Sequence, residues 1–368
     1  MSLSRDQRQV DHSLNHCLSL AVAAGAITVL IIVSNLSNGT PLSAHFPSTS
    51  DALILIADDM RAMDSVIAKR LQSDVPLVSQ VSRYIVAAGG KRLRPALLLL
   101  MCGVLGFRGD QRYNLAAVVE FIHTATLLHD DVVDESKLRR GRATANEAFG
   151  NPASVLVGDF LYSRAFQMMV EAGDMRIMQT LAEATNVIAE GEVMQLMNMH
   201  DASLSTDAYL RVIRSKTAKL FEASARIAAL LAGGSPAVEH SCAAFGRSLG
   251  TAFQVIDDVL DYDGDVTEMG KNLGDDLREG KATLPLIIAL QRASPAEQAI
   301  IRDAIEAGDT TQMGQILTIV EKTGAILATR EAAAIEARHA LDALLTLPSN
   351  AHRDVLEGLA SELLSRRA

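Results

Sequence analysis

Two segments of the sequence each place three aspartates within or directly after a long apolar run. The first, Asp130 to Asp134, follows an almost wholly apolar stretch from Leu115 to Leu128, and the second spans Asp257 to Asp261. Aspartates four residues apart share one face of a helix, about one turn from each other. Buried carboxylates need cations. The chain must therefore fold so that two apolar helices bring their acid clusters face to face, with divalent ions between them.

The composition indicates an all-α protein. Of the 368 residues 49% are hydrophobic, whereas aromatic residues make up only 4% and tryptophan is absent. Apolar residues recur at three- and four-residue intervals, and alternating runs typical of strands are few. This length allows one large domain or two, with a sizeable core.

The net charge and the cysteines limit the expected binding partners and the cellular compartment. A formal net charge of −10 disfavours a nucleic-acid partner, although local basic clusters can still bind anions. The three cysteines, Cys17, Cys102 and Cys242, have neither metal-ligand spacing nor an even disulfide framework, which indicates a reducing compartment.

Residues 1–50 differ from the rest of the chain. Arg5 and Arg8 precede an apolar run from Leu18 to Val33, and a stretch rich in Ser, Asn and Pro follows. The run is shorter than the roughly 20 residues of a membrane span, and no clear cleavage site follows it. We interpret residues 1–50 as a dispensable leader, with a signal or anchor as the alternative, and residues 51–368 as the catalytic domain. We expect a cytoplasmic protein, with membrane association through the leader as the alternative.

Basic residues recur near both acid clusters. Gly89 and Gly90 open a sharp loop before Lys91, Arg92 and Arg94, where backbone N–H groups and side chains can hold a phosphate. The alternative is an ordinary helix cap with solvated charges. Further cations follow the first acid cluster, and they form either a surface charge network or a site for a polyphosphate held through magnesium: Lys137, Arg139, Arg140 and Arg142.

Three other stretches carry candidate site residues. Lys216 and Thr217 lie in an apolar helix predicted over Leu210 to Leu231, and a buried lysine favours an anionic partner. The polar loop from Gly270 to Lys281 holds two more lysines. A methionine-rich helix end is typical of core packing, with a substrate wall as the alternative: Met194, Met197 and Met199.

Together these motifs resemble the trans-isoprenyl diphosphate synthases, and specifically the long-chain polyprenyl diphosphate synthases of the octaprenyl type. The resemblance spans roughly Leu55 to Ile288 and rests on motifs that follow the family's order. These motifs are Gly89 to Pro95, the two aspartate clusters, Arg139-Arg140-Gly141, Lys216-Thr217, Phe253-Gln254 and the Gly270 to Lys281 loop. It implies a bundle of mostly antiparallel helices around a deep central cavity, usually as a homodimer.

The resemblance also implies the reaction. The protein would add isopentenyl diphosphate units to an allylic diphosphate, with farnesyl diphosphate as the expected primer. The expected all-trans product is octaprenyl diphosphate, delivered to the membrane for a quinone side chain. Nona- and decaprenyl or shorter products are the alternatives.

Site residues carry over position by position as further implications of the resemblance. Two or three Mg²⁺ ions would be bound by Asp130, Asp134, Asp257 and Asp261, with Asp131 and Asp258 in support. The allylic diphosphate would be bound by Arg139, Lys216 and Lys271, with Thr217 and Gln254 lining the reaction centre. Isopentenyl diphosphate would be held by Lys91, Arg94, His123 and Arg140. By its position alone, His123 could equally be an ordinary core histidine.

Two small residues before the first acid cluster are candidates for control of product length. Ala125 and Thr126 lie five and four residues before Asp130, so their side chains are expected to project about one turn below the metal site. In the family, bulky aromatic residues near these positions give short products, so small ones imply an open tunnel. The alternative is that they only permit close helix packing.

Two rival functions share some of these features. A class I terpene cyclase also ionises a diphosphate with an aspartate-rich helix, but it needs no second diphosphate site. Lys91, Arg94 and the complete second cluster therefore favour condensation. A non-catalytic partner subunit is expected to have lost motif residues, and none is missing from this sequence.

Overall fold

The computed structural model describes residues 54–87, 90–139, 141–263 and 273–365. All of them belong to the second of two compact units, Phe46–Ala368, so the expected leader and its fate lie outside the described residues. The all-α expectation is confirmed, since helices account for most of the described residues.

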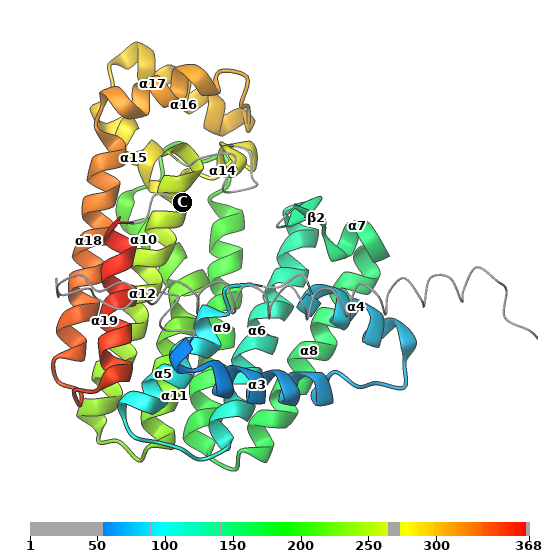
Figure 1. Cartoon of the computed structure of the whole chain (residues 1–368). Coiled ribbons are helices and arrows are strands. Elements are labelled where there is room, and N and C mark those ends of the chain that lie inside the picture. The colour runs from blue at the N-terminus through cyan, green and yellow to red at the C-terminus, as the bar shows by residue number, and fades with distance from the viewer. Residues whose placement is uncertain (1–53, 88–89, 140, 264–272, 366–368) are drawn as a thin grey trace, which may run out of the picture. The chain divides into compact units, whose positions relative to one another are not determined.

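The described elements follow one another as helices joined mostly by short connections, interrupted by one small hairpin (Figure 1). In chain order they are α3 (Ala57–Arg70), α4 (Pro76–Ala87), α5 (Leu93–Val104), α6 (Gln111–Val133), β1 (Leu138–Arg139), β2 (Arg142–Ala143), α7 (Ala145–Phe149), α8 (Asn151–Glu171), α9 (Met175–Met197), α10 (Thr206–Ile213), the π-helical turn η1 (Arg214–Ala218), α11 (Lys219–Leu231), α12 (Pro236–Asp263), α14 (Asp275–Arg278), α15 (Leu284–Arg292), α16 (Pro295–Ala307), α17 (Met313–Lys322), α18 (Ala325–Leu344) and α19 (Ala351–Ser365).

Two hydrophobic cores meet along α12. The larger core contains Phe245 and Leu249 from α12 together with residues of α3, α5, α6, α8 and α11. The smaller core contains Val255 and Leu260, further along the same helix, together with residues of α15, α16 and α17. Figure 1 shows α15, α16 and α17 gathered beside one end of α18, the helix that packs along α12. The second aspartate cluster therefore lies in the part of α12 that belongs to the smaller core.

Glycines allow the helices that carry the site to approach one another closely. A Cβ atom at Gly246 would lie 2.4 Å from the Phe221 carbonyl oxygen, and one at Gly191 would lie 2.7 Å from the Lys216 backbone nitrogen. Neither neighbour can yield, because both contacts are with backbone atoms. The segment that carries Lys216 is thus packed tightly against α9, and α11 against α12.

The structure differs from the sequence prediction in three places. The helix predicted over Leu210 to Leu231 contains a π-helical turn, η1, at Lys216 and Thr217. The basic segment after the first acid cluster forms the β1–β2 hairpin, in which Arg139 pairs with Arg142. Met197, expected in the core, is 77% exposed. Within the described ranges, no helix is long and apolar enough to cross a membrane.

Candidate active site

A cavity of about 640 Å³ collects most of the predicted site residues that the structure describes. Its walls come from α4, α5, α6, α9, η1, α11 and α12. The predicted residues that line it are Lys91, Arg94, His123, Thr126, Asp130, Arg139, Lys216, Thr217, Gln254 and Asp257. Arg140 and Lys271, also predicted, lie outside the described residues.

In the first acid cluster, two carboxylates each face a lysine. The helix α6 ends at Val133, and the Asp134 N–H caps it by donating to the Asp130 carbonyl oxygen at 2.8 Å. The Lys216 Nζ lies 3.5 Å from Asp130 Oδ2, and the Lys281 Nζ lies 3.5 Å from Asp134 Oδ2. Burial raises the pKa of Asp130, while the Lys216 ammonium opposes that shift. These two carboxylates therefore lie where added cations would stabilise them.

The middle residue of this cluster, Asp131, has a different role. Its side chain is fully buried, and Arg139 donates to its Oδ1 from Nη2 at 2.7 Å and from Nε at 3.0 Å. The Asn146 side chain also donates to the Asp131 carbonyl oxygen, at 3.1 Å. Asp131 thus anchors the β1–β2 hairpin and holds Arg139 at the cavity wall.

Glu192 is a site residue that the sequence reasoning missed. It lines the cavity from α9, and its Oε2 lies 2.5 Å from the Lys216 Nζ. Burial raises the pKa of Glu192 to about 7, although the Lys216 ammonium acts in the opposite direction. The only signal in the sequence is the preceding Gly191, whose missing side chain lets η1 approach α9.

The second acid cluster turns its three aspartates in three directions. Asp257 is exposed and lines the main cavity. Asp258 is buried and accepts hydrogen bonds from the Tyr209 hydroxyl at 2.6 Å and from Gln254 Nε2 at 2.8 Å. Asp261 accepts from the backbone N–H groups of Asp275 and Asp276, at 3.2 and 3.3 Å, at the start of α14.

Burial affects the proton affinity of the last two aspartates. It raises the pKa of Asp258 well above the usual range, and the Asp276 carboxylate adds to the shift. It raises the pKa of Asp261 to about 8, again with a contribution from Asp276. Of the three, Asp257 is the one that lines the main cavity, and the metal-binding roles of Asp257 and Asp261 stay predictions.

The predicted isopentenyl diphosphate site is built around Arg94. Its Nη1 lies 3.1 Å from His123 Nε2, and its guanidinium carbon lies 4.6 Å from the centre of the Phe221 ring. Burial lowers the pKa of Arg94 to about 10, while the Glu120 carboxylate limits the shift. Lys91 lies at the exposed end of the same group. Arg94 and His123 are thus held together at one wall of the cavity.

Arg92, between these two cations, is the N-cap residue of α5 and also lines the cavity. Its backbone is left-handed, with φ = 45°, immediately before α5. Its side chain pairs with Asp64 and lies 3.8 Å from Glu120. The cations Arg92 and Arg94 of this motif therefore differ in their partners.

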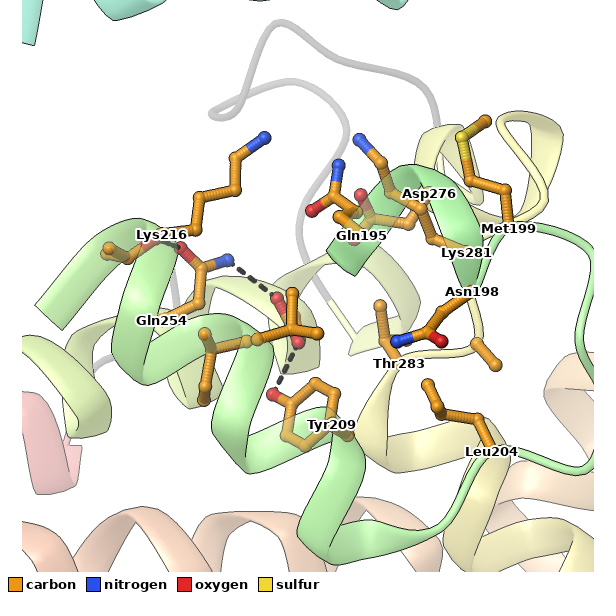
Figure 2. A pocket seen from close by; sticks show the side chains of 15 residues that line it. Gln195, Asn198, Met199, Leu204, Tyr209, Lys216, Gln254, Asp276, Lys281 and Thr283 are labelled. Atoms are coloured by element: carbon orange, nitrogen blue, oxygen red, sulfur yellow. Dashed lines mark hydrogen bonds between the residues drawn. The ribbon is translucent and has the colours of Figure 1, made fainter. Parts of the chain in front are cut away.

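A smaller pocket of about 130 Å³ lies next to the main cavity and shares Lys216, Thr217 and Gln254 with it (Figure 2). Lys281 lines this pocket. Burial alone would lower the pKa of Lys281, but the carboxylates of Asp276, Glu279 and Asp134 together raise it. Lys281 comes from the polar loop that was expected to supply Lys271, so the loop delivers at least one cation to the site.

The two candidate chain-length residues are placed differently. Thr126 lines the cavity, and its hydroxyl donates to the His123 carbonyl oxygen at 2.7 Å. Ala125 is fully buried in the larger core and is not among the residues that line the cavity. Thr126 is thus a cavity-lining residue and Ala125 a core residue of the same helix, and the control of product length by either one stays a prediction.

The donor set suits a metal that takes few protein ligands. No group of three or more His, Cys, Asp or Glu side chains in the described part of the chain forms a complete metal site. Mg²⁺ typically binds one or two carboxylates and completes its shell with water and substrate phosphates. Asp130, Asp134 and Asp257, spread over two helices, fit that pattern.

Comparisons with known proteins identify close relatives. A family model described as polyprenyl synthetase matches residues 75–323. The chain is 50% identical to the octaprenyl diphosphate synthase of Escherichia coli (strain K12) over 313 residues, which cover 85% of this chain and 97% of that protein. It is 45% identical to the all-trans-nonaprenyl-diphosphate synthase (geranyl-diphosphate specific) of Rhodobacter capsulatus over 319 residues, covering 86% and 97%.

Solved structures agree with these matches. A polyprenyl synthase from Caulobacter crescentus CB15, complexed with calcium and isoprenyl diphosphate, superposes with a TM-score of 0.84 at 45% identity, covering 89% of this chain and all of that one. A decaprenyl diphosphate synthase from Rhodobacter capsulatus superposes with a TM-score of 0.83 at 44% identity, covering 87% and 99%.

Proposed function

Because this chain belongs to the polyprenyl synthetase family, and is accordingly a prenyltransferase, we propose that it makes octaprenyl diphosphate from isopentenyl diphosphate and an allylic primer. One observation carries the proposal: a single cavity is lined by aspartates from both clusters and by cations that have different partners. Lys216 and Arg139 pair with Asp130 and Asp131, whereas Arg94 contacts His123 and the Phe221 ring. Two groups of cations suit two diphosphates.

The chemistry follows from this division. The bond between C1 and the diphosphate oxygen of the allylic substrate breaks, and the departing diphosphate takes the electron pair. C1 then bonds to the terminal carbon of isopentenyl diphosphate, and the released diphosphate takes up the proton whose loss forms the new double bond. Fixed positive charge at the leaving group stabilises this transition state. Lys216 and Arg139 supply it from the protein, and exclusion of water from the loaded cavity would protect the cation.

A divalent metal ion serves the family, and we propose that it is Mg²⁺ here, two or three ions per site. Asp130, Asp134 and Asp257 would hold the ions, with Asp261 available if it leaves the α14 amides. Bound Mg²⁺ would neutralise the charge that develops on the departing diphosphate. The lysines now beside Asp130 and Asp134 would then be free to contact the phosphates.

The second diphosphate needs no ionisation, and we assign it to the cationic group around Arg94. Lys91, Arg94 and His123 would bind isopentenyl diphosphate, together with Arg140. The ring of Phe221 beneath Arg94 keeps the guanidinium in place by a cation–π contact. Thr217 and Gln254 line both the main cavity and the smaller pocket.

Product length and primer belong to the proposal as well. The identity to an octaprenyl diphosphate synthase, at 50%, exceeds that to the nonaprenyl enzyme, at 45%, which supports eight units over nine. Farnesyl diphosphate is our expected primer, and a membrane quinone side chain is the expected destination.

The test is a direct assay of product size. Purified protein is incubated with radiolabelled isopentenyl diphosphate, farnesyl diphosphate and Mg²⁺, and the dephosphorylated product is sized by chromatography. We expect an eight-unit product that requires Mg²⁺ and disappears in EDTA. A cyclised hydrocarbon, or no incorporation of isopentenyl diphosphate, would overturn the proposal in favour of a terpene cyclase or an inactive subunit.

We further propose that residues 51–368 form the whole catalytic domain, since the first predicted site residue is Lys91. A protein that begins at Asp51 should keep the full chain's kcat. Loss of soluble, active protein on truncation would show that the leader stabilises the fold.

An exposed apolar face supports a homodimer. Leu156, Phe166 and Val170 on α8 are exposed, as are Val193 and Leu196 on α9, a helix that contacts α8. A second copy of this chain would cover them. Leu156→Asp should yield monomers in sedimentation analysis, whereas Leu345→Asp, at an exposed leucine after α18, should not. Unchanged sedimentation of both variants would argue against this face.

A further inference from the structure

Four side chains from three elements form an unbroken line of hydrogen bonds behind the cavity wall. The Thr217 hydroxyl donates to Gln254 Oε1 at 3.0 Å, and Gln254 Nε2 donates to Asp258 Oδ1 at 2.8 Å. The Tyr209 hydroxyl donates to Asp258 Oδ2 at 2.6 Å. Figure 2 shows Tyr209 and Gln254 approaching from opposite sides, with dashed bonds to the carboxylate between them.

The Tyr209 side of the line is nearly buried, and both Tyr209 and Asp258 border the smaller pocket. Tyr209 is 4% exposed and Asp258 is 3% exposed. None of the four side chains is among the buried polar groups that lack a hydrogen-bond partner in the described part of the chain. A buried network whose members are all satisfied has one arrangement that is strongly preferred.

This network fixes which way the Gln254 amide faces. A glutamine amide has similar shape in either of two orientations, and its neighbours decide between them. The Asp258 carboxylate accepts, so the NH₂ group faces it, and the carbonyl oxygen is left to face Thr217. The Tyr209 hydroxyl donates to the second carboxylate oxygen of Asp258. This hydrogen bond holds the carboxylate in the orientation in which it accepts from Gln254.

The orientation matters for the proposed reaction. Gln254 and Thr217 line the main cavity beside Lys216 and Asp257. A carbonyl oxygen there places partial negative charge near the allylic cation, whereas a reversed amide would place partial positive charge there. Such a fixed dipole lowers the barrier without reorganising during the reaction.

We propose that Tyr209 is a positioning residue that acts through Asp258 to hold the Gln254 carbonyl oxygen toward Thr217 and the reaction centre. The proposal rests on the proposed function and assigns a role to two residues outside the metal site. Asp258, in spite of its place in the aspartate cluster, then serves the amide and not a metal ion.

The decisive variant is Tyr209→Phe, which removes only the hydroxyl. We expect kcat to fall about tenfold, equivalent to ~1.4 kcal/mol of barrier, because Gln254 loses its fixed orientation. The KM for isopentenyl diphosphate should not change, since Lys91, Arg94 and His123 belong to other elements. A rise in that KM with unchanged kcat would contradict the assignment.

The matched control is Tyr262→Phe. Tyr262 is also buried, lies on α12, and accepts a hydrogen bond from Thr283 at 3.4 Å outside the network. Both variants should lose similar thermal stability, but only Tyr209→Phe should lose kcat. Equal losses of kcat would show that the effect of Tyr209 is merely structural.

A double variant tests whether Tyr209 acts through Gln254. In a Gln254→Ala background, Tyr209→Phe should cause no further loss, because there is no amide left to orient. Multiplying losses would overturn the proposal. If the wild type is active and Tyr209→Phe has the same kcat, the role of Tyr209 is refuted and the proposed function stands. If the wild type makes no product, both the proposed function and the role of Tyr209 are refuted.

A second pair of variants applies if Tyr209→Phe does not fold. In Asp258→Asn, the new Oδ1 can still accept from Gln254, and the Tyr209 hydroxyl can turn to accept from the new Nδ2. Asp258→Ala has neither contact. Asp258→Asn should therefore retain several-fold more activity than Asp258→Ala, and equal activities would overturn the proposal.

Discussion

At the end of α6, Asp130 and Asp134 each face a lysine, whereas at the end of α12 only Asp257 lines the main cavity. The spacing of aspartates in the two clusters is the same. The difference comes from what packs behind each helix. Behind α6, Arg139 takes up the middle aspartate and leaves the outer two available. Behind α12, Tyr209 and the α14 amides take up two of the three.

A repeated motif therefore does not imply a repeated site. From the first cluster one carboxylate, Asp130, lines the main cavity, and Asp130 and Asp134 each lie beside a lysine. The second contributes one carboxylate to the cavity and uses another to orient a neutral amide. The following predictions test this asymmetry.

The largest effect is expected at the first cluster. Asp130→Asn or Asp134→Asn should lower kcat about 10²–10³-fold, or ~2.7–4 kcal/mol of barrier, by analogy with the loss of a group that stabilises transition-state charge. Steady-state rates with saturating substrates measure this. Asp159→Asn is the control, because Asp159 is an exposed aspartate on α8. Wild-type rates in either cluster variant would refute the metal role.

The second cluster should respond unevenly to the same change. Asp257→Asn should raise the Mg²⁺ concentration for half-maximal activity about tenfold, because its carboxylate faces the cavity. Asp258→Asn should leave that concentration unchanged, because the Asp258 side chain contacts Tyr209 and Gln254. A titration of activity against Mg²⁺ separates the two effects. An equal Mg²⁺ shift in both variants would mean that Asp258 is a metal ligand and that the clusters are symmetric.

The difference between the clusters also shows which features of the site could be predicted from the sequence. The placement of Asp130 and Asp134 on one helix face follows from helical spacing alone, but their lysine partners, Lys216 and Lys281, come from distant parts of the chain. The roles of Asp258 and Asp261 do not follow from spacing, because their partners Tyr209 and Asp275 are set by tertiary packing. Identical spacing cannot reveal different partners.

The same limit explains the other differences. Glu192 belongs to no charge pattern, and it reaches Lys216 only because Gly191 lets a π-helical turn pack against α9. That turn shifts the register of every side chain after it, which a regular helical pattern cannot predict. Ala125 and Thr126 are adjacent, yet one faces the core and the other the cavity. Both were predicted to control product length because both are small. Only the packing of α6 against its neighbours determines which of the two side chains lines the cavity.

A substitution one turn before the first acid cluster is expected to change the length of the product. Thr126→Tyr should give an active enzyme with shorter products, because its side chain lines the cavity. Ala125→Tyr should instead destabilise the fold, because overpacking a filled core typically costs about 1–3 kcal/mol or more. Product chromatography and thermal unfolding measure the two outcomes. Thr126→Val is the control and should keep the wild-type length; short products from a well-folded Ala125→Tyr would place Ala125 at the tunnel wall instead.

The smallest effect concerns Glu192, which shares Lys216 with the first cluster. Burial raises the pKa of Glu192 from 4.5 to about 7 in the folded protein. Between these values the folded state binds more protons than the unfolded state, so the free energy of unfolding falls as the pH rises through this range. Denaturant unfolding in EDTA, from pH 4.5 to 8, should show this fall in the wild type and a shallower one in Glu192→Gln. Glu190→Gln, two residues earlier at an exposed position, should follow the wild type. Parallel curves for wild type and Glu192→Gln would mean that the carboxylate remains ionised beside Lys216, and that Lys216 is bound more tightly to α9 than to the acid cluster.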